Sequence, residues 1–231
     1  MASPADLCPP VAMAADLYPP LNLKISTPLL ELHGATDDLL TQLLPVVRAG
    51  VAGSPPFPFD DPMSLYDDNP GRERRWLQAI WRGRGTVRPD SWRLYFAVMV
   101  EGQAVGMQDL LGREFDSFRT VSTFSWLAPG VRHRGLGREM RAAILHLAFE
   151  GFGASEATSE AFFDNVASNR VSEVMGYQPD GSDWATRRGE AAVLKRWRLT
   201  RDAWAANRRS DIELTGVDEC KPVLYITDTV R

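Results

Sequence analysis

The sequence has few of the residues that build disulfide-linked or metal-bound proteins. Its two cysteines, Cys8 and Cys220, lie near opposite ends of the 231 residues and fit neither a disulfide framework nor a zinc motif. Its three histidines are scattered and lack the spacing of metal ligands. We therefore expect no bound metal, and so few cysteines are typical of a protein in the reducing cytoplasm.

Long apolar runs and a strong excess of charge are also missing. No run approaches the roughly 18 residues that a membrane helix needs, so we expect no membrane contact. Residues 1–20 lack the basic segment that opens a secretory signal, which favours a cytoplasmic location. The 26 basic and 30 acidic residues give a formal charge of -4, which predicts no affinity for nucleic acid. Any phosphate site must be local.

The apolar pattern predicts one α/β domain. Hydrophobic residues make up 44% of the chain and charged residues 24%, a balance typical of a globular protein. Strands are expected over residues 21–32 with a break, and over 94–100, 104–111, 121–127, 157–163 and 193–199, with one more beside Arg188. Helices are expected over 37–47, 73–81, 137–148 and 165–175. We expect the domain to span residues 21–207, between a tail over 1–20 and an extension over 208–231.

The segment after the strand at 121–127 carries the clearest sign of a binding site. Gly135 and Gly137 allow close backbone approach at the start of the next helix, where free amides and the positive dipole end attract anions. Basic side chains surround these glycines: Arg132, His133, Arg134, Arg138 and Arg141. The pattern favours a phosphate-binding loop; an ordinary glycine turn before a solvated basic helix is the alternative.

Two well-known phosphate motifs fit the segment poorly. A dinucleotide-binding fingerprint needs a glycine where Met140 stands, although Glu160 lies near the distance expected of a ribose-binding acid. A P-loop needs Gly-Lys-Ser/Thr, which the sequence lacks. Both interpretations are weakened, and a nicotinamide-dependent enzyme remains only as a minor alternative.

Two motifs in order resemble the GNAT (GCN5-related) N-acyltransferase superfamily. Arg132-x-x-Gly135-x-Gly137 is similar to its coenzyme A signature, Gln/Arg-x-x-Gly-x-Gly/Ala. Residues 164–171, Asp-Asn-Val-Ala-Ser-Asn-Arg-Val, followed by Met-Gly-Tyr177, resemble the Asn-x-x-Ser…Gly-Phe/Tyr segment of the RimJ/RimL-like branch. The wider pattern is also similar to actinobacterial GNAT proteins for which succinyl-CoA has been proposed as donor.

The resemblance implies a fold and a cofactor site. The GNAT fold is an α/β (α+β) fold, a mixed and mostly antiparallel sheet of about seven strands, splayed between strands 4 and 5 and flanked by about four helices. An acyl-CoA, acetyl-CoA or succinyl-CoA, would lie in the splay. The residues implied to bind it are the backbones of Trp126 and Leu127, the loop residues Arg132, His133, Arg134, Gly135, Leu136, Gly137 and Arg138, and the side chains of Asn165 and Ser168.

The catalytic groups are less clearly marked. Many GNAT enzymes protonate the leaving thiolate with a tyrosine at the position of Ser172, so the resemblance to the RimL-like branch transfers that role to Ser168. A hydrogen-bonding residue at a helix start is the alternative for Ser168. For the general base, the residues offer Glu160, Asp109, Glu114 and Asp116, and we favour Glu160. Each could instead be an ordinary surface charge, with water carrying the proton.

The resemblance implies transfer of an acyl group to a primary amine of a small molecule or a protein, by an enzyme that forms a homodimer or higher homo-oligomer. The alternative is a catalytically silent acyl-CoA-binding sensor or assembly module, because the tyrosine and a carboxylate in the fourth strand are missing. The Pro/Phe-rich stretch over residues 54–59 could cover the acceptor or bind a partner.

Overall fold

The computed structural model describes residues 14–51, 57–59 and 65–227. Cys8 and residues 54–56 of the Pro/Phe-rich stretch lie outside these ranges. The strands are β1 (Lys24–Ser26), β2 (Glu31–Gly34), β3 (Ser91–Val100), β4 (Gln103–Arg113), β5 (Thr120–Leu127), β6 (Glu156–Phe162), β7 (Gln178–Arg187), β8 (Glu190–Thr200) and β9 (Glu213–Thr215). The longer helices are α2 (Asp37–Ala49), α3 (Gly71–Arg84), α5 (Leu136–His146) and α6 (Val166–Val174).

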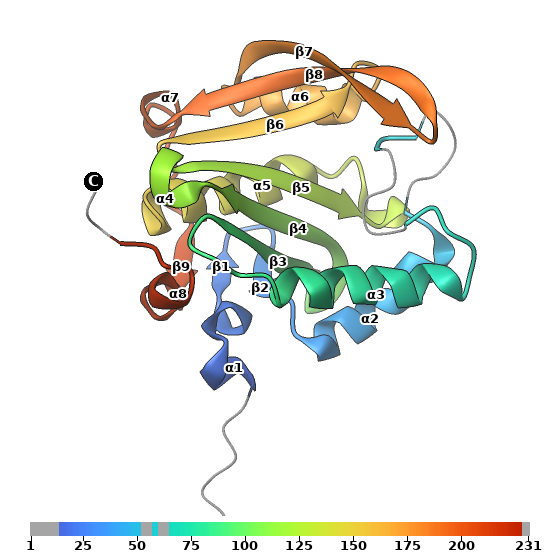
Figure 1. Ribbon diagram of the computed structural model, residues 1–231, viewed down its shortest axis with the longest axis horizontal. Coiled ribbons are helices and arrows are strands. Elements are labelled where there is room, and N and C mark those ends of the chain that lie inside the picture. The colour runs from blue at the N-terminus through green and yellow to red at the C-terminus, as the bar shows by residue number, and fades with distance from the viewer. Residues whose placement is uncertain (1–13, 52–56, 60–64, 228–231) are drawn as a thin grey trace, which may run out of the picture.

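Short helical segments complete the fold. They are α1 (Ala14–Leu17), η2 (Pro19–Asn22), α4 (Phe115–Phe118), η4 (Pro129–Val131), η5 (Leu147–Gly151), α7 (Arg201–Ala205) and α8 (Val217–Val223). All strands belong to one sheet, in the order β7-β8-β6-β5-β4-β3-β2-β1-β9. Figure 1 shows β6, β7 and β8 at one end of this sheet and β1, β2 and β9 at the other. The expected mixed, mostly antiparallel GNAT-like sheet is confirmed.

Local sequence explains where the helices begin. The side-chain oxygen of Thr36 caps α2 by accepting a hydrogen bond from the Leu39 amide at 3.3 Å, and two aspartates follow in the first turn. Leu40, Leu43 and Val47 then recur on one side of this helix and are buried. The predicted helices at 37–47, 73–81, 137–148 and 165–175 are thereby all found, each within a few residues of its expected bounds.

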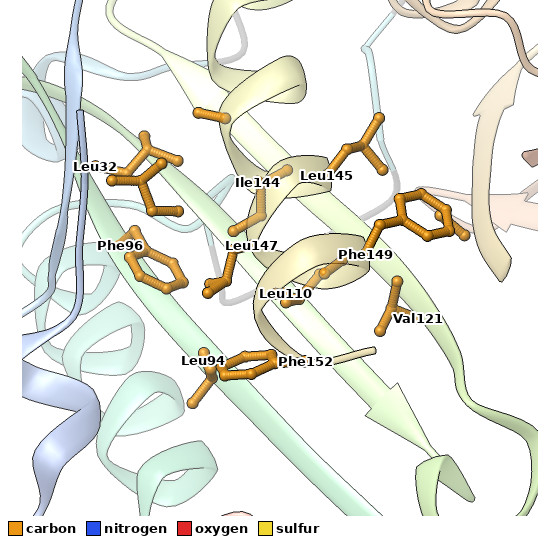
Figure 2. Packing of buried hydrophobic residues seen from close by; sticks show 14 of the residues in the cluster. Leu32, Leu94, Phe96, Leu110, Val121, Ile144, Leu145, Leu147, Phe149 and Phe152 are labelled. Carbon is orange, nitrogen blue, oxygen red and sulfur yellow. The ribbon is translucent and has the colours of Figure 1, made fainter. Parts of the chain in front are cut away.

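Helices cover both faces of the sheet. Alternate residues of β3 point to opposite faces, so this strand contributes side chains to two cores. Leu94, Phe96 and Val98 join the larger core on the α5 side. Figure 2 shows strand residues Leu32, Leu94, Phe96 and Leu110 packed with Ile144, Leu147 and Phe152 of α5 and its continuation. Their neighbours Tyr95, Ala97 and Met99 face the second core, which contains residues of α2 and α3.

The sheet has nine strands where the sequence predicted about seven. The broken strand at 21–32 forms β1 and β2, which a turn at Thr27–Leu30 separates: the Leu30 carbonyl accepts a hydrogen bond from the Thr27 side chain at 2.9 Å. The ninth strand comes from the C-terminal extension, where β9 pairs with β1. Beyond it, Cys220, Leu224 and Ile226 are buried in the larger core. Residues after 207 thus complete both sheet and core.

The predicted splay between the fourth and fifth expected strands is confirmed at β5 and β6. These two strands run parallel, and only Thr120, Val121 and Ser122 pair with Glu156, Ala157 and Thr158. From Thr123 to Leu127, β5 has no strand partner on that side, whereas it stays paired with β4 as far as Leu127. The strands therefore diverge and leave a gap, which we call the β5/β6 gap.

Candidate active site

Two cavities meet at the β5/β6 gap. The helix cavity, of about 450 Å3, lies between β5 and the helices α5 and α6. The sheet cavity, of about 820 Å3, is lined mainly by β5, β6, β7 and β8. Six residues line both cavities: Pro58, Phe59, Thr123, Phe124, Ser159 and Glu160. A molecule in one cavity can therefore react with a molecule in the other only near these residues.

The backbone of β5 presents unpaired polar groups to the gap. The amide of Ala128 donates to the Val105 carbonyl on the β4 side at 2.8 Å, and the Val121 carbonyl accepts from Thr158 on the β6 side. Since strand residues alternate, the amides of Ser125 and Leu127 face the gap, and that of Trp126 faces β4. The carbonyl of Leu127 is already held by Arg132, from Nε at 3.0 Å and Nη2 at 2.8 Å.

The start of α5 is open at the other end of the helix cavity. Gly135 precedes the helix with a φ of 80°, a left-handed conformation that favours glycine, and no side chain caps the helix. A Cβ placed at Gly135 would meet nothing within 4 Å, and one at Gly137 would meet only Val171 Cγ2, at 3.9 Å. The first-turn amides are therefore accessible to an anion.

The basic residues of this loop differ in what they contact. Arg132 also donates a hydrogen bond to the Val51 carbonyl, and burial lowers the pKa of its guanidinium below the usual value. His133 and Arg138 are exposed and line the helix cavity. Arg134 is exposed and does not line it. Arg132 thus stabilises the end of β5 through hydrogen bonds to backbone carbonyls. His133 and Arg138 are available to a ligand.

On the α6 side, Asn165 joins the start of α6 to the segment that contains Pro58. Its Oδ1 accepts a hydrogen bond from the Ser168 amide at 3.1 Å, which caps α6, and its Nδ2 donates to the Pro58 carbonyl at 3.1 Å. Asn165 and Ser168 both line the helix cavity. Ser172 is buried with a hydroxyl that has no partner in the described part of the chain, and it lines neither cavity.

The four candidate bases lie in different surroundings. Glu160 is exposed and is the one carboxylate that lines both cavities among the described residues. Asp109 is fully buried, where Arg93 donates to its Oδ2 at 2.9 and 2.5 Å; burial outweighs the guanidinium and raises the pKa of the carboxyl to about 6. Glu114 and Asp116 are exposed and line neither cavity. Glu160 alone is at the gap.

Comparisons with known proteins agree with this geometry. The family model described as "Acetyltransferase (GNAT) domain" matches residues 58–178, more than half of the chain and the whole of both strands at the gap. The chain belongs to the GNAT acetyltransferase family. Three solved structures support the GNAT fold.

A GCN5-related N-acetyltransferase from Brucella melitensis is 15% identical, with a TM-score of 0.62 and coverage of 80% of this chain and 81% of its own. RimL, a ribosomal L7/L12 alpha-N-protein acetyltransferase in complex with coenzyme A, is 14% identical, with a TM-score of 0.61 and coverage of 77% and 97%. An acetyltransferase from Salmonella typhimurium that modifies the N-terminal serine of L7/L12 is 14% identical, with a TM-score of 0.57 and coverage of 75% and 96%.

The helix cavity of this GNAT domain is lined by groups of the kinds that bind coenzyme A. Open amides and the exposed guanidinium of Arg138 at the start of α5 suit a diphosphate. The gap-facing amides of β5 suit an extended arm that carries amide groups of its own.

No group of three or more His, Cys, Asp or Glu side chains that could hold a metal ion occurs within residues 14–51, 57–59 and 65–227. Over the same ranges, no helix has the length and hydropathy to span a membrane.

Sequence reasoning missed two residues at the junction of the two cavities and did not predict the burial of a third residue nearby. Thr123 and Ser159 line both cavities, and Arg141 lines the helix cavity from the second turn of α5. The alternation of β6 contained a signal for Ser159, since it follows the buried Ala157 on the same face. Arg141 is predicted among the basic side chains of a phosphate-binding loop, but it is 5% exposed and its Nη1 donates to the Ser159 hydroxyl of β6 at 3.1 Å.

Proposed function

We propose that this GNAT protein is an acyl-CoA-dependent N-acyltransferase that acylates a primary amine. The observation that carries the proposal is the meeting of two separate cavities at the unpaired stretch of β5. One cavity offers anion-binding amides and the other is larger and open to an acceptor. A transfer enzyme with two substrates needs this arrangement, whereas a protein that only binds an acyl-CoA has no use for the second cavity.

On the donor side, the chain's residues would bind and orient the thioester. The amides at Gly135, Leu136 and Gly137, with the exposed side chains of His133 and Arg138, would hold the diphosphate. Asn165 and Ser168 would border the arm from α6. Arg132 fixes the Leu127 carbonyl and so keeps the Leu127 amide directed into the gap, where it can donate to a developing oxyanion.

The bound thioester supplies an activated acyl group: its carbon–sulfur bond breaks, a carbon–nitrogen bond forms, the amine loses a proton and the thiolate gains one. Glu160 is placed to accept the amine proton, directly or through water, because it lines both cavities. Ser168, which lines the helix cavity, is the candidate for delivering a proton to sulfur. Phe59 and Phe124, in contact at 5.5 Å between ring centres, restrict water at the junction.

The proposal admits two donors and two classes of acceptor. The donor is acetyl-CoA or succinyl-CoA, and the acceptor is a small-molecule amine or a protein amine. RimL acts on a ribosomal protein, which makes an N-terminal amine of a protein one class to test. Assembly as a homodimer and a cytoplasmic location stay predictions from the sequence.

Thiol release tests the proposal. Purified protein is incubated with acetyl-CoA or succinyl-CoA and a mixture of small amines and N-terminal peptides, and free thiol is measured with and without amines. Amine-dependent release that falls at least about 100-fold in Glu160→Gln is expected. Binding of both thioesters without release would instead favour a silent acyl-CoA sensor. The specific observation behind that alternative is Ser172, which is buried away from the cavity where other family members have an acidic hydroxyl.

A further inference from the structure

The sheet cavity carries basic side chains at the end away from the helix cavity. Arg93 of β3 and Arg113 of β4 both line the sheet cavity, and neither lines the helix cavity. Arg93 pairs with Leu111, so Arg113, two residues further on, is its diagonal neighbour on the same face of the sheet, with about 7 to 8 Å between the Cα atoms. Two like charges this close repel each other unless an anion lies beside them.

The arginines of this cavity differ in how their charge is balanced. Nε and Nη2 of Arg93 both donate to Asp109 Oδ2, at 2.9 and 2.5 Å, which leaves Nη1 without a hydrogen bond within the described residues. Arg196 and Arg198 of β8 are each ion-paired with carboxylates of neighbouring strands. Arg113 is exposed and forms no ion pair or hydrogen bond in the described part of the chain. Its charge is therefore available to a ligand.

A hydroxyl group extends this arrangement across the next strand. The strands β3, β4 and β5 lie side by side in the sheet (Figure 1). Ser122 of β5 pairs with Leu111, which pairs with Arg93, so the three residues form one row on one face. The Ser122 hydroxyl donates no hydrogen bond within the described residues and also lines the sheet cavity. We call Arg93, Arg113 and Ser122 the basic end of the cavity.

The junction end of the same cavity carries an unbalanced acid. Glu160 is exposed and forms no ion pair within the described residues. Its cross-strand neighbour Arg196 donates instead to the Asp180 carbonyl, at 3.1 Å. Asp180, the other carboxylate that lines this cavity among the described residues, is ion-paired with Arg198 at 3.1 Å. The cavity thus presents an acid at the junction and cations at its far end.

The separation of the two ends sets the length of a molecule that could contact both. Phe124 lines the junction and Thr120 lines the far end of the cavity, so four residues of β5, or about 13 Å, lie between them. A free amino acid holds its amine and carboxylate within about 4 Å of each other, which is too short. An extended peptide spans about 3.4 Å per residue, so the distance corresponds to about four residues.

The direction of the cavity agrees with the position of the reacting atoms. The Leu127 amide lies further along β5 than Phe124, on the side away from Thr120. An acceptor amine that enters the gap beside Glu160 therefore points towards the Leu127 amide, and a group held at the basic end stays away from the thioester.

We propose that the acceptor is a peptide or protein N-terminus with an acidic side chain near its fourth residue, which the basic end binds while the N-terminal amine reaches Glu160. This inference rests on the acyltransferase function and deepens it by naming the acceptor class. Nη1 of Arg93, the guanidinium of Arg113 and the Ser122 hydroxyl supply the donors for charge-assisted hydrogen bonds to that carboxylate.

Equilibrium binding of peptides tests the inference apart from turnover. Eight-residue peptides with an N-terminal serine and a C-terminal fluorophore carry one glutamate at the second, fourth or eighth residue, or glutamine at all three. Their Kd is measured by fluorescence anisotropy in the presence of coenzyme A, which has no acyl group to transfer. The wild type should bind the peptide with glutamate at the fourth residue at least about tenfold more tightly than the glutamine peptide. Glutamate at the second or eighth residue should gain less than about threefold.

Substitutions at Arg113 test which side chain reads the acid. Arg113→Gln should reduce the preference for glutamate at the fourth residue to less than about threefold. Arg113→Glu should reverse it, in favour of a peptide with lysine at that residue. Arg82→Gln is the matched control, because Arg82 is an exposed arginine of α3 that lines neither cavity and has no ion pair within the described residues. It should keep the wild-type preference.

The outcomes separate this inference from the acyltransferase itself. Equal Kd values of the wild type for the glutamate and glutamine peptides, or a preference that Arg113→Gln leaves intact, would overturn the inference. An equal gain from glutamate at every position would also overturn it, since only overall charge would then matter. If small amines give thiol release and no such preference exists, the acyltransferase stands and this inference is refuted. A preference at the fourth residue without thiol release from any amine would support the acidic-peptide site and refute the transfer.

Discussion

Ser122 and Thr158 are the last pair that joins β5 to β6. Beyond this pair the two strands diverge, while β5 continues to pair with β4 as far as Leu127. The gap therefore has a closed end, at Ser122 and Thr158, and an open end, at the start of α5. The donor's diphosphate belongs at the open end, and its arm belongs along the unpaired stretch of β5 from Thr123 to Leu127, beside Glu160 and Ser159, which line both cavities.

The open helix start predicts an unusual pair of effects for Gly137→Ala. Alanine favours a helix over glycine by about 1 kcal/mol, and the added Cβ would meet only Val171 at 3.9 Å, so the free energy of unfolding should rise or stay constant. The same Cβ projects where a diphosphate must approach, so the Kd for coenzyme A should rise about tenfold. Urea unfolding and calorimetry measure the two effects. Gly130→Ala, at a position with nothing within 4 Å of the new Cβ and outside both cavities, should change neither.

Glu160→Gln should separate chemistry from donor binding. The amide keeps the shape of the side chain but cannot accept the amine proton, so kcat should fall by about 100-fold or more. The Kd for coenzyme A should stay within about twofold, because Glu160 lies at the junction and not among the phosphate-binding groups. Steady-state thiol release and calorimetry give the two numbers. Glu114→Gln, an exposed acid outside both cavities, should behave as the wild type; comparable activity of the two variants would remove Glu160 from the mechanism.

His146 predicts a loss of stability in mild acid. Burial lowers the pKa of its imidazole below the usual 6.5. Below pH 6.5 the unfolded chain therefore takes up a proton that the folded protein excludes, so stability falls as the pH drops from 6.5 towards the lower folded pKa, by at most about 1.4 kcal/mol per pH unit. In His146→Phe, which can keep the contact with Trp204, this part of the loss should vanish. Urea unfolding at several pH values checks it; an identical pH profile in the variant would contradict the assignment.

Truncation after Asn207 should destabilise the domain strongly. The segment that follows supplies β9 to the sheet and buries Cys220, Leu224 and Ile226 in the larger core. Burial of each such side chain contributes about 1.5 to 3 kcal/mol, so removal of all three should cost several kcal/mol. Thermal unfolding of the truncated chain measures this. Deletion of residues 228–231 alone serves as the control, and a truncated chain with the full-length melting temperature would show that the extension is dispensable.

The sequence predicted those features that local pattern determines. The apolar spacing of residues 137–148, with Gly135 and Gly137 at their start, predicts a helix with an open start, and α5 confirms the helix. The splay followed from the family resemblance, and the paired and unpaired parts of β5 agree with it. β9 was not predicted, because three residues joined to a distant strand leave no periodic signal. The burial of Arg141 was not predicted either, since charge alone suggests solvent and only the packing of α5 on the sheet removes it.

Amide chemical shifts on addition of coenzyme A test the central claim most directly. The account predicts saturable shifts of the amides of Gly135, Leu136, Gly137 and Leu127 in a nuclear magnetic resonance titration, with the amides of β1 and β9 unchanged. Shifts confined to other parts of the domain, or none at coenzyme A concentrations of about 1 mM, would contradict a cofactor site at the start of α5 and with it the proposed acyl transfer.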